Sequence, residues 1–351
     1  MSRARKIGYA VVGLGAIAQS SVLPAFAGSK RAKLVALVSR DRNKAARLAK
    51  KFGAGAFYSN EEYDTCLANP DIAAIYVATP PGVHREFTVR AARAGKHVLC
   101  EKPLAATVEQ SLAMVEACAR AGVLLMTAYR KYYEPSSLYL KQLVQNGDLG
   151  RIDVIHTSFS ELPMPPSCPV WLFDPQLAGG GPLMDLGIYC VNTSRWLVEE
   201  DPVEVDACAW RHDTVRFREV EEGISFRMHF PSGLLVQGAS TYAAAPSSFI
   251  YIQGTKGWVF LSPAFPFEEE RWVMGKIAGR RVERKFKTVD EFSPQIDAFA
   301  ASIQGGGPLV AADGMQGHRD IIILHAIYQS AKEQKPVVVR YESQVKGLRA
   351  T

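Results

Sequence analysis

The sequence contains few cysteines, and none has the spacing of a metal or redox site. Six cysteines occur among the 351 residues, with no Cys-x-x-Cys pair and no histidine at metal-ligand spacing beside them. Several lie in apolar segments such as Val98-Leu99-Cys100, which is typical of small buried side chains in a reducing compartment. We therefore expect neither disulfides nor a bound metal.

Long hydrophobic runs and a large charge of one sign are also absent. No apolar run approaches the roughly 20 residues that a membrane helix needs. The basic N-terminus and Ala25-Phe26-Ala27 imitate a secretory signal, but Gly8, Gly13 and Gly15 interrupt the apolar stretch. The net charge is +6, from 41 Lys+Arg and 35 Asp+Glu, without the dense basic face of a nucleic-acid domain. We expect a cytoplasmic protein that binds neither nucleic acid nor membrane.

What the sequence contains is ordinary globular composition, 48% hydrophobic and 22% charged, and a change of pattern near residue 128. Residues 1–128 alternate short apolar runs with amphipathic segments, which is typical of a parallel sheet covered by helices. Residues 129–351 contain longer strands with period-two alternation and hairpin turns, which favours an antiparallel sheet. The expected strands are 7–12, 34–38, 56–58, 74–77, 97–100, 124–128, 152–161, 202–211, 219–230, 233–242, 248–253 and 257–261.

These patterns predict an α/β protein with two domains. The N-terminal domain, 1–128, is expected to be a doubly wound, parallel sheet of the Rossmann type. The C-terminal domain, 129–351, is expected to be an α+β domain with a large, open, mainly antiparallel sheet, which binds the substrate and forms the oligomer.

A glycine-rich turn follows the first expected strand. Gly13-Leu14-Gly15-Ala16-Ile17-Ala18 reads G-x-G-x-x-A at the start of a helix. The glycines permit a tight turn and let backbone N–H groups approach a pyrophosphate, whose charge a helix N-terminus favours. Such a turn is often only a turn, but its place at the first strand-to-helix junction favours dinucleotide binding. We expect contacts to the cofactor from Gly13, Leu14, Gly15, Ala16 and Ile17.

The end of the second expected strand decides between NAD and NADP. Domains that bind NAD carry an acid there, which accepts hydrogen bonds from the ribose hydroxyls. Here the position is Ser39, followed by Arg40, with Lys44 one helical turn further on. These three side chains can all donate to a 2′-phosphate. Asp41 is the rival, because it would restore NAD binding if the strand ended two residues later. We predict NADP(H).

Two further loops follow expected strands. Ala78-Thr79-Pro80-Pro81-Gly82-Val83-His84 follows the fourth strand, where parallel strands end at a cofactor crevice, although this could equally be loop structure. Glu101-Lys102-Pro103 follows the fifth strand. A lone lysine at a strand end is usually solvated, but an ionic pair at the mouth of an apolar strand is costly unless it is used.

With these motifs the chain resembles the Gfo/Idh/MocA family of oxidoreductases. The resemblance rests on the G-x-G-x-x-A turn, Ala78-Thr79-Pro80-Pro81 with His84, Ala94-Gly95-Lys96-His97-Val98, Glu101-Lys102-Pro103 and Ala178–Gly187. The family pattern ends Asp-x-Gly-x-His, whereas this chain reads Asp185-Leu186-Gly187-Ile188-Tyr189. A tyrosine at this point is similar to the glucose-fructose oxidoreductase branch and its aldose-oxidising relatives.

The resemblance implies a set of site residues. The implied cofactor contacts come from Thr79, Pro80, His84, Glu101, Lys102, Arg130 and Trp171. The implied catalytic residues are Lys102, Asp185 and Tyr189, and the implied substrate contacts are those three with Tyr133. Leu172 stands where the family often has an arginine after the tryptophan, so that cofactor contact is missing.

The spacing of Asp185 and Tyr189 suggests how they would act. Four residues apart, they would share one face of a helix expected over 182–197, after a triple glycine that could lie close to a ligand. A phenol is a weak acid, and the Lys102 ammonium would stabilise its ionised form. Tyr189 could then take the proton of an anomeric hydroxyl while Asp185 holds the sugar. The alternative is that Tyr189 is a core aromatic, and we interpret His156 and Tyr242 as structural.

The sequence therefore predicts an NADP(H)-dependent aldose dehydrogenase that transfers hydride from C1 of a sugar such as D-glucose or D-xylose and yields a lactone. Three alternatives stay open: an aldose-ketose or aldose-aldose oxidoreductase with tightly bound NADP(H), a trans-dihydrodiol dehydrogenase, and a non-catalytic NADP-binding regulator. A regulator would not need the three catalytic side chains together. An open sheet needs cover, so we also expect a homodimer or homotetramer formed through the C-terminal sheet.

Overall fold

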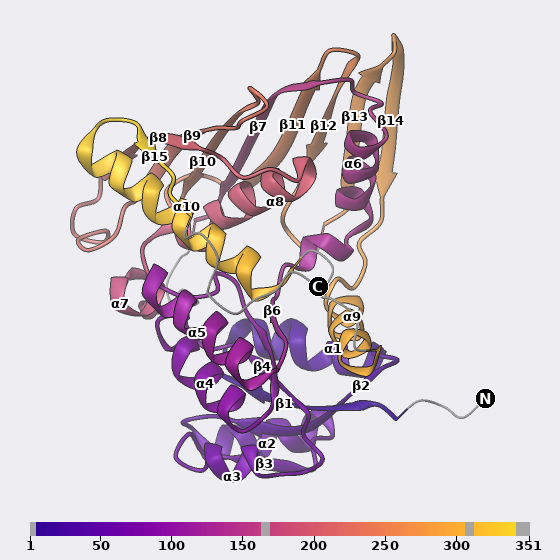
Figure 1. Cartoon of the computed structure of the whole chain (residues 1–351), viewed down its shortest axis with the longest axis vertical. Coiled ribbons are helices and arrows are strands. Elements are labelled where there is room, and N and C mark those ends of the chain that lie inside the picture. Colours follow the sequence, from indigo (N-terminus) through magenta and orange to yellow (C-terminus); the bar gives the residue numbers. More distant parts are fainter. Residues whose placement is uncertain (1–4, 163–168, 268, 306–311, 342–351) are drawn as a thin grey trace. The chain divides into compact units, whose positions relative to one another are not determined.

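The computed structural model describes residues 5–162, 169–267, 269–305 and 312–341 (Figure 1). Within these ranges the chain forms two compact units. The first contains the residues up to Arg130 together with Asp290–His318, and the second contains Lys131–Val289 together with Arg319–Tyr341. In the part of the chain that is described, no helix is long and apolar enough to cross a membrane.

The first unit is built on a six-stranded parallel sheet with the order β3-β2-β1-β4-β5-β6. Its strands are β1 (Ile7–Val12), β2 (Ala32–Val38), β3 (Ala56–Tyr58), β4 (Ala74–Val77), β5 (His97–Cys100) and β6 (Leu125–Thr127). The strand order reverses between β1 and β4, and the loops after these strands lie where α/β sheets bind ligands. The predicted Rossmann sheet is confirmed.

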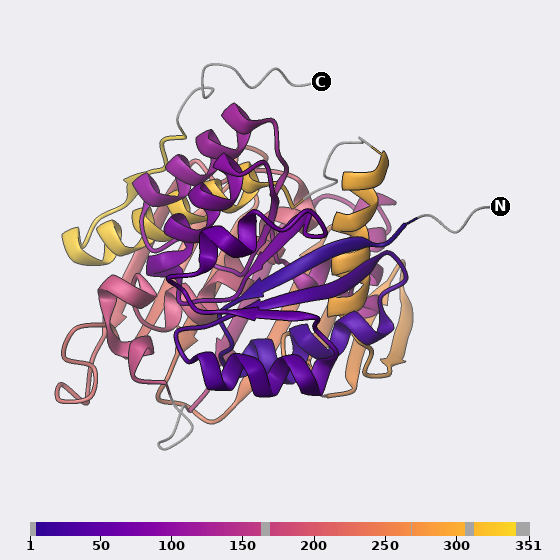
Figure 2. The same ribbon diagram turned by 90° about the horizontal axis from the view of Figure 1, so that it is seen from below.

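Helices cover both faces of this sheet (Figure 2). They are the π-helical turn η1 (Ala18–Val22), α1 (Leu23–Gly28), α2 (Arg42–Phe52), α3 (Tyr63–Leu67), α4 (Pro81–Arg93), α5 (Val108–Ala121) and α9 (Phe292–Gly305). α4 packs on α5, and α1 packs on α9. The strands are therefore shielded from solvent, and β4 is buried along its whole length.

α9 belongs to the first unit, although the sequence placed all of 129–351 in a second domain. Ser293 Oγ on α9 donates to the carbonyl oxygen of Ala25 at 2.7 Å. Asp297 accepts from the backbone N–H groups of Lys30 and Arg31 at 2.9 and 2.8 Å. These contacts join segments 266 to 268 residues apart, so no local pattern indicates them. The first boundary, at Arg130, lies two residues from the predicted one.

The second unit is built on a nine-stranded sheet with the order β14-β13-β12-β11-β7-β10-β9-β8-β15. Its strands are β7 (Ile152–Ser160), β8 (Glu204–Trp210), β9 (Gly223–His229), β10 (Leu235–Thr241), β11 (Ser247–Gly254), β12 (Gly257–Ser262), β13 (Arg271–Ile277), β14 (Arg280–Phe286) and β15 (Val337–Val338). Only the pair of β7 with β10 is parallel among these strands. The predicted large, mainly antiparallel sheet is confirmed.

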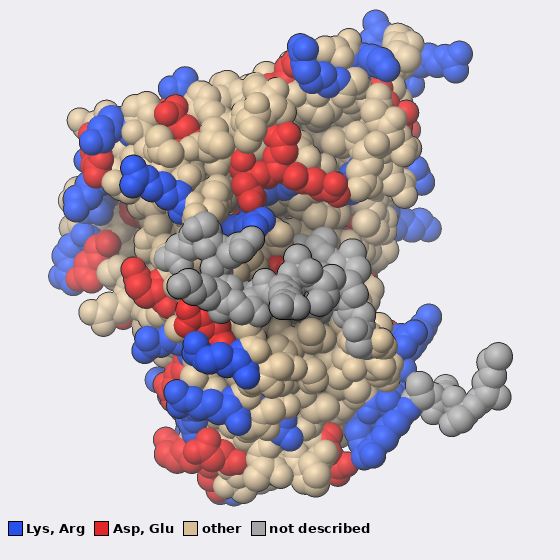
Figure 3. Space-filling model, viewed as in Figure 1, with Lys and Arg blue, Asp and Glu red and all other residues tan. Residues whose placement is uncertain are grey.

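β13 and β14 were not expected from the sequence. β14 carries Arg280, Arg281, Arg284 and Lys285, and its basic composition reads as solvated surface rather than as a strand. Lys and Arg side chains project along this edge of the sheet in Figure 3. Charged side chains on an edge strand oppose pairing with another chain, which explains why the edge can remain uncovered.

Helices cover one face of this sheet, as Figure 1 shows. They are α6 (Pro135–Gln145), α8 (Ile188–Val198) and the part of α10 (Gly314–Glu333) after His318, with the short elements η2 (Arg130–Tyr133), η3 (Val170–Phe173), α7 (Pro175–Ala178) and η4 (Leu183–Gly187). Along β7, Ile155 and Phe159 are buried on the covered face, whereas His156 and Ser158 are half-exposed on the other. We call this second face the open face.

A buried carboxylate, Glu134, joins the start of α6 to β13. Its oxygens accept hydrogen bonds from the backbone N–H groups of Ser136 and Ser137, both at 2.8 Å, and so cap the helix. Lys131 Nζ lies 3.4 Å and Arg271 Nη1 lies 3.8 Å from it, and all three side chains are at most 3% exposed. Burial alone would raise the pKa of Glu134, but these charges and hydrogen bonds lower it to about 2.

We expect Glu134→Gln to destabilise the folded protein most strongly at neutral pH. The folded-state pKa is lower than the unfolded one, so the carboxylate stabilises the fold fully above about pH 4.5 and progressively less as pH falls towards 2. The full effect is about 3 kcal/mol, and urea unfolding followed by tryptophan fluorescence measures it. The variant should have a lower midpoint at pH 7, and the two proteins should converge on acidification.

Glu283→Gln is the matched control for this experiment. Glu283 pairs with Arg281 at 3.0 Å, but both side chains are at least 53% exposed. Its loss should therefore change the free energy of unfolding by less than about 0.5 kcal/mol. A wild-type midpoint for Glu134→Gln at pH 7 would contradict the stabilising role of the buried carboxylate.

Candidate functional site

The glycine-rich turn after β1 has a closed side and an open side. Gly13 has φ +89°, and a Cβ there would lie 2.6 Å from the carbonyl oxygen of Ala78. A Cβ at Gly15 would meet no atom within 4 Å, and both Gly15 and Ala16 are exposed. The turn is thus packed against the loop after β4 and free over Gly15, where a helix begins. A pyrophosphate fits such a bare helix N-terminus.

The loop after β4 contains an orphaned hydroxyl. Thr79 Oγ1 is buried, and no hydrogen-bond partner for it lies among the described residues. Thr79 Cγ2 lies only 2.8 Å from the position that a Cβ on Gly13 would take, so this side chain adjoins the glycine-rich turn. Buried hydroxyls normally have partners. A cofactor group at this turn would supply one, and the residues present therefore fit a dinucleotide.

His84 lies beside the loop after β4. Its side chain is fully buried, with Nε2 2.7 Å from the carbonyl oxygen of Thr79 and Nδ1 3.1 Å from that of Leu104. Burial lowers the pKa of His84, and the two carbonyl groups oppose that shift. His84 therefore helps to hold the Thr79 loop, and its contact with the cofactor stays a prediction.

The end of β2 separates the two cofactor interpretations. β2 ends at Val38, so Ser39 occupies the position of the acid found in NAD-binding domains. Asp41, the rival acid, is the N-cap of α2 and accepts a hydrogen bond from the backbone N–H of Lys44 at 2.9 Å. Arg40 is exposed. This arrangement favours a 2′-phosphate over free ribose hydroxyls.

Lys102 is the one side chain that its segment presents outward. Residues 98–106 are all buried except Lys102, which is half-buried. Glu101 is held by the hydroxyl of Tyr76 at 2.7 Å and by the backbone N–H of Lys102 at 3.2 Å. Burial raises the pKa of Glu101 in spite of these donors. Glu101 therefore holds the backbone that carries Lys102.

The segment at η2 presents Tyr133 in the same way. Tyr133 is the only residue of 125–134 that is not buried. Tyr132 stacks on Trp196 with ring centroids 4.5 Å apart and faces inward. Arg130, predicted beside the nicotinamide, is 5% exposed and forms a buried ion pair with Glu291 in the first unit. The ion pair with Glu291 was not expected from the sequence, and the contact of Arg130 with the nicotinamide stays a prediction.

Asp185 and Tyr189 lie in the helical segment predicted over 182–197, since helical backbone runs from Pro182 to Val198. The segment begins with a π-helical turn, η4 (Leu183–Gly187), which the sequence did not indicate, and the α-helix α8 follows from Ile188. Asp185 and Tyr189 are the only two residues of 180–195 that are not buried. The ring of Tyr189 packs against Phe159 and Phe265, with centroids 5.6 and 5.5 Å away.

The triple glycine before η4 packs against protein atoms. A Cβ on Gly180 would overlap the hydroxyl of Tyr328, and one on Gly181 would lie 2.5 Å from the carbonyl oxygen of Glu221. The buried Glu221 carboxylate accepts from the backbone N–H groups of Gly181 and Leu183, both at 3.0 Å. The glycines thus allow this carboxylate to fix the turn that carries Asp185.

Tyr242, which we interpreted as structural from the sequence, lies beside Asp185. Its hydroxyl donates to Oδ2 of Asp185 at 2.8 Å. Tyr242 follows β10 and shares the covered face with Val236 and Ser240, and this alternation was the available signal. Trp171 is half-buried in η3, and residues 163–168 before it, with Cys168, lie outside the described ranges.

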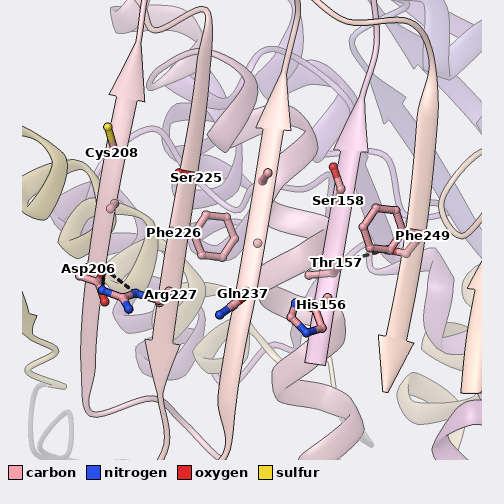
Figure 4. A pocket seen from close by; sticks show the side chains of 13 residues that line it. His156, Thr157, Ser158, Asp206, Cys208, Ser225, Phe226, Arg227, Gln237 and Phe249 are labelled. Atoms are coloured by element: carbon pink, nitrogen blue, oxygen red, sulfur yellow. Dashed lines mark hydrogen bonds and ion pairs between the residues drawn. The ribbon is translucent and has the colours of Figure 1, made fainter. Parts of the chain in front are cut away.

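A hollow of about 570 Å³ lies on the open face of the second unit (Figure 4). Ser158, Ala239, Ser225 and Cys208 stand side by side on neighbouring strands at its floor. His156, predicted to be structural, lies at its rim, and none of the predicted catalytic residues lines it. Among the described residues, no cluster of three or more His, Cys, Asp or Glu could hold a metal ion.

Comparisons with known proteins match nearly the whole chain. Residues 7–129 match the family described as "Oxidoreductase family, NAD-binding Rossmann fold", and residues 137–260 match the GFO/IDH/MocA C-terminal domain. The chain is 31% identical over 333 residues to an NADP(+)-dependent D-xylose 1-dehydrogenase of Haloarcula marismortui, covering 94% of this chain and 92% of that one. A second such enzyme, from Haloferax volcanii, is 30% identical over 92% of this chain and 97% of its own.

The comparison with solved structures finds a relative of the same kind. Aldose-aldose oxidoreductase from Caulobacter crescentus, complexed with glycerol, has a TM-score of 0.90 and 36% identity, covering 95% of this chain and all of that one. The predicted enzyme class is confirmed, and the NADP(H) prediction agrees with the cofactor of the named dehydrogenases. On the strength of its two matched domains, this chain belongs to the Gfo/Idh/MocA family of oxidoreductases.

Proposed function

We propose that the chain is a cytoplasmic, NADP(H)-dependent sugar oxidoreductase that oxidises an aldose such as D-glucose or D-xylose at C1 to an aldonolactone. The observation that carries the proposal is the pattern of exposure around the motifs. Lys102, Asp185 and Tyr189 remain accessible in segments whose other residues are buried. Relatives named as D-xylose 1-dehydrogenases and an aldose-aldose oxidoreductase support this substrate class.

The first unit would hold the cofactor. Backbone N–H groups of the 13–17 turn bind the pyrophosphate, and the Thr79 hydroxyl, adjoining Gly13, donates to the same region. Ser39, Arg40 and Lys44 donate to the 2′-phosphate. NADP+, when bound, accepts the hydride from the sugar.

The remaining side chains would handle the proton and the sugar. Lys102 donates a hydrogen bond to the anomeric oxygen of the sugar. Tyr189 takes the proton of the anomeric hydroxyl as C1 becomes a carbonyl carbon. Asp185 accepts a hydrogen bond from another ring hydroxyl, and Tyr133 contributes to the wall of the site.

A closely related reaction keeps NADP(H) bound and returns the hydride to a second sugar. The 36% identity to an aldose-aldose oxidoreductase favours this reaction over that of a trans-dihydrodiol dehydrogenase and over a non-catalytic regulator. Absorbance at 340 nm of freshly purified protein separates it from a simple dehydrogenase, because a dehydrogenase that exchanges its cofactor is isolated mostly without it. A trans-dihydrodiol dehydrogenase would instead turn over aromatic diols in preference to sugars.

We further propose that the open face joins two copies of the chain. The β11–β13 half of this face is aromatic. The ring centroids of Tyr251 and Trp258 lie 5.8 Å apart, and those of Phe249 and Phe260 lie 5.6 Å apart. Trp272 is 40% exposed. The other half is the hollow of small side chains over β7–β10. A two-fold dimer would place the aromatic half of one copy over the hollow of the other, which buries both.

Arg40→Ala should weaken NADPH binding by about 10-fold, because one charge-assisted hydrogen bond to the 2′-phosphate is lost. NADH binding should change by less than about twofold, because NADH lacks that phosphate. Fluorescence titration with each nucleotide measures both. Arg47→Ala, an exposed arginine on the same helix α2, is the control and should leave both affinities unchanged. Equal weakening of NADPH and NADH would rule out the 2′-phosphate role.

Tyr189→Phe should lower kcat for the preferred aldose by about 100-fold or more with little change in KM, because only proton transfer is lost. Initial rates of NADPH formation measure this. Tyr139→Phe is a matched control, because it removes a hydroxyl from a tyrosine that has no proposed role. Tyr139 belongs to α6 and packs on Phe286, with ring centroids 5.7 Å apart. Activity of Tyr189→Phe within about twofold of wild type would end the proton-transfer assignment.

Ala239→Arg should convert a dimer to a monomer, because the new side chain fills the hollow that the second copy would occupy. Light scattering after gel filtration at micromolar concentration gives the mass. Val215→Arg places the same side chain at an 87% exposed position outside the sheet and should leave the mass unchanged. A wild-type protein that is monomeric under these conditions disproves the proposed interface.

A further inference from the structure

Tyr76 lies in β4 and connects this strand to the segment that carries Lys102. Its side chain is fully buried, and its hydroxyl donates to Oε1 of Glu101 at 2.7 Å. Nε2 of Gln295 on α9, a side chain that is also fully buried, donates to the same hydroxyl oxygen at 3.4 Å. Because the amide N–H uses the hydroxyl oxygen as its acceptor, the hydroxyl proton is directed to Glu101. All these residues belong to the first unit.

Glu101 uses its second oxygen to hold the main chain. Oε2 accepts a hydrogen bond from the backbone N–H of Lys102 at 3.2 Å, and Glu101 is 8% exposed. One carboxylate thus binds the Tyr76 hydroxyl on one side and the backbone of Lys102 on the other. A change in its orientation or its charge therefore reaches Lys102 through a single hydrogen bond.

The Tyr76 hydroxyl also favours the ionised form of this carboxyl group. Burial raises the pKa of Glu101, and the hydrogen bond from Tyr76 is the strongest of the interactions that lower it. Tyr76 itself stays protonated, because burial and next the charge of Glu101 raise the pKa of Tyr76 well above its usual value. The tyrosine is therefore a permanent donor to a carboxyl group that can gain or lose a proton.

Three further charged or titratable groups face Glu101 from the surrounding elements. The charges of Lys102 and Arg130 lower the pKa of Glu101, but less than the Tyr76 hydrogen bond does. Arg130 also forms a buried ion pair with Glu291, which precedes α9. The thiol of Cys100 at the end of β5 stays protonated, because burial and next the charge of Glu101 raise the pKa of Cys100 well above its usual value.

We propose that Tyr76 is a positioning residue, which orients the ionised carboxylate of Glu101 so that it holds the backbone of Lys102 in the conformation that catalysis requires. Gln295 supports this arrangement by directing the Tyr76 hydroxyl. The inference rests on the proposed sugar oxidoreductase function, in which Lys102 contacts the anomeric oxygen. A reacting group that is misplaced by about 1 Å slows such a reaction strongly, because proximity and orientation supply much of the rate.

The test is the pH dependence of kcat/KM for the preferred aldose at saturating NADP+, measured in wild type and in Tyr76→Phe. In wild type, kcat/KM should fall as the pH falls through the pKa of Glu101, which is raised from 4.5. Tyr76→Phe keeps the ring but removes the strongest donor to the carboxylate, so the pKa of Glu101 should rise further. The acid limb of the profile should therefore move up by about one pH unit. At pH 7, kcat/KM should fall by about 10-fold.

Tyr63→Phe is the matched control. Tyr63 is equally buried in the same unit, but its hydroxyl donates to an uncharged acceptor, the backbone carbonyl oxygen of Phe87, at 3.1 Å. This variant loses one buried hydrogen bond that does not involve Glu101, so its acid limb should coincide with that of wild type. A coincident acid limb for Tyr76→Phe as well would overturn the positioning role, whatever the loss of rate.

Glu101→Gln replaces Tyr76→Phe if that variant does not fold, as judged by its thermal midpoint. The amide keeps the shape of the side chain and does not titrate, so kcat/KM should be low at every pH and the acid limb should be lost. An acid limb at its wild-type position in Glu101→Gln would refute the inference. If wild-type protein with NADP+ oxidises no sugar, the proposed function fails and this inference fails with it, whereas sugar turnover with an unmoved acid limb refutes the role of Tyr76 alone.

Discussion

Close packing of backbone against backbone at two glycines determines where the candidate site residues emerge. Gly13 lies against Ala78 in the first unit, and Gly181 lies against Glu221 in the second, each with no space for a Cβ. The first contact brings the turns after β1 and β4 together at the point where the strand order reverses. The second fixes the start of η4 and hence the position of Asp185. In both units a close backbone contact thus fixes the segment from which candidate site residues emerge.

Buried carboxylates complete this scaffold. Glu101, Glu134 and Glu221 each accept backbone N–H groups of the segment that they hold. A buried ion or carboxyl group is costly unless it is hydrogen-bonded. Each of these carboxyl groups therefore favours the one backbone conformation of its segment that supplies the N–H donors. Lys102, Tyr133 and Asp185 stand at or next to these segments. Rigidity close to the reacting groups is therefore a property of polar contacts as much as of the apolar core.

Local patterns were sufficient to predict the two sheets and the glycine-rich turn, whereas the roles of Lys102, Asp185 and Tyr189 stay predictions that came from the family resemblance. Local patterns could not indicate that α9 returns to the first unit, because its contacts span 266 to 268 residues. The π-helical turn at Leu183–Gly187 is anchored at its start by Glu221, which lies 38 to 40 residues away in sequence. The partners of His84 and Tyr242 are likewise set by tertiary contacts, which no local pattern indicates. The basic composition of β14 concealed a strand because its pairing with β13 outweighs intrinsic preference.

The division of the first unit between two distant stretches of chain has a consequence for biosynthesis. Residues up to Arg130 leave the ribosome early, yet Asp297, which accepts from the backbone of Lys30 and Arg31, is translated only after the whole large sheet. The nucleotide-binding half therefore has to wait, with the surface that α9 will cover still exposed, while the other half is made. In the cell, the portion synthesised first is completed last, and chaperone protection during that interval matters most for the face around α1 and β2.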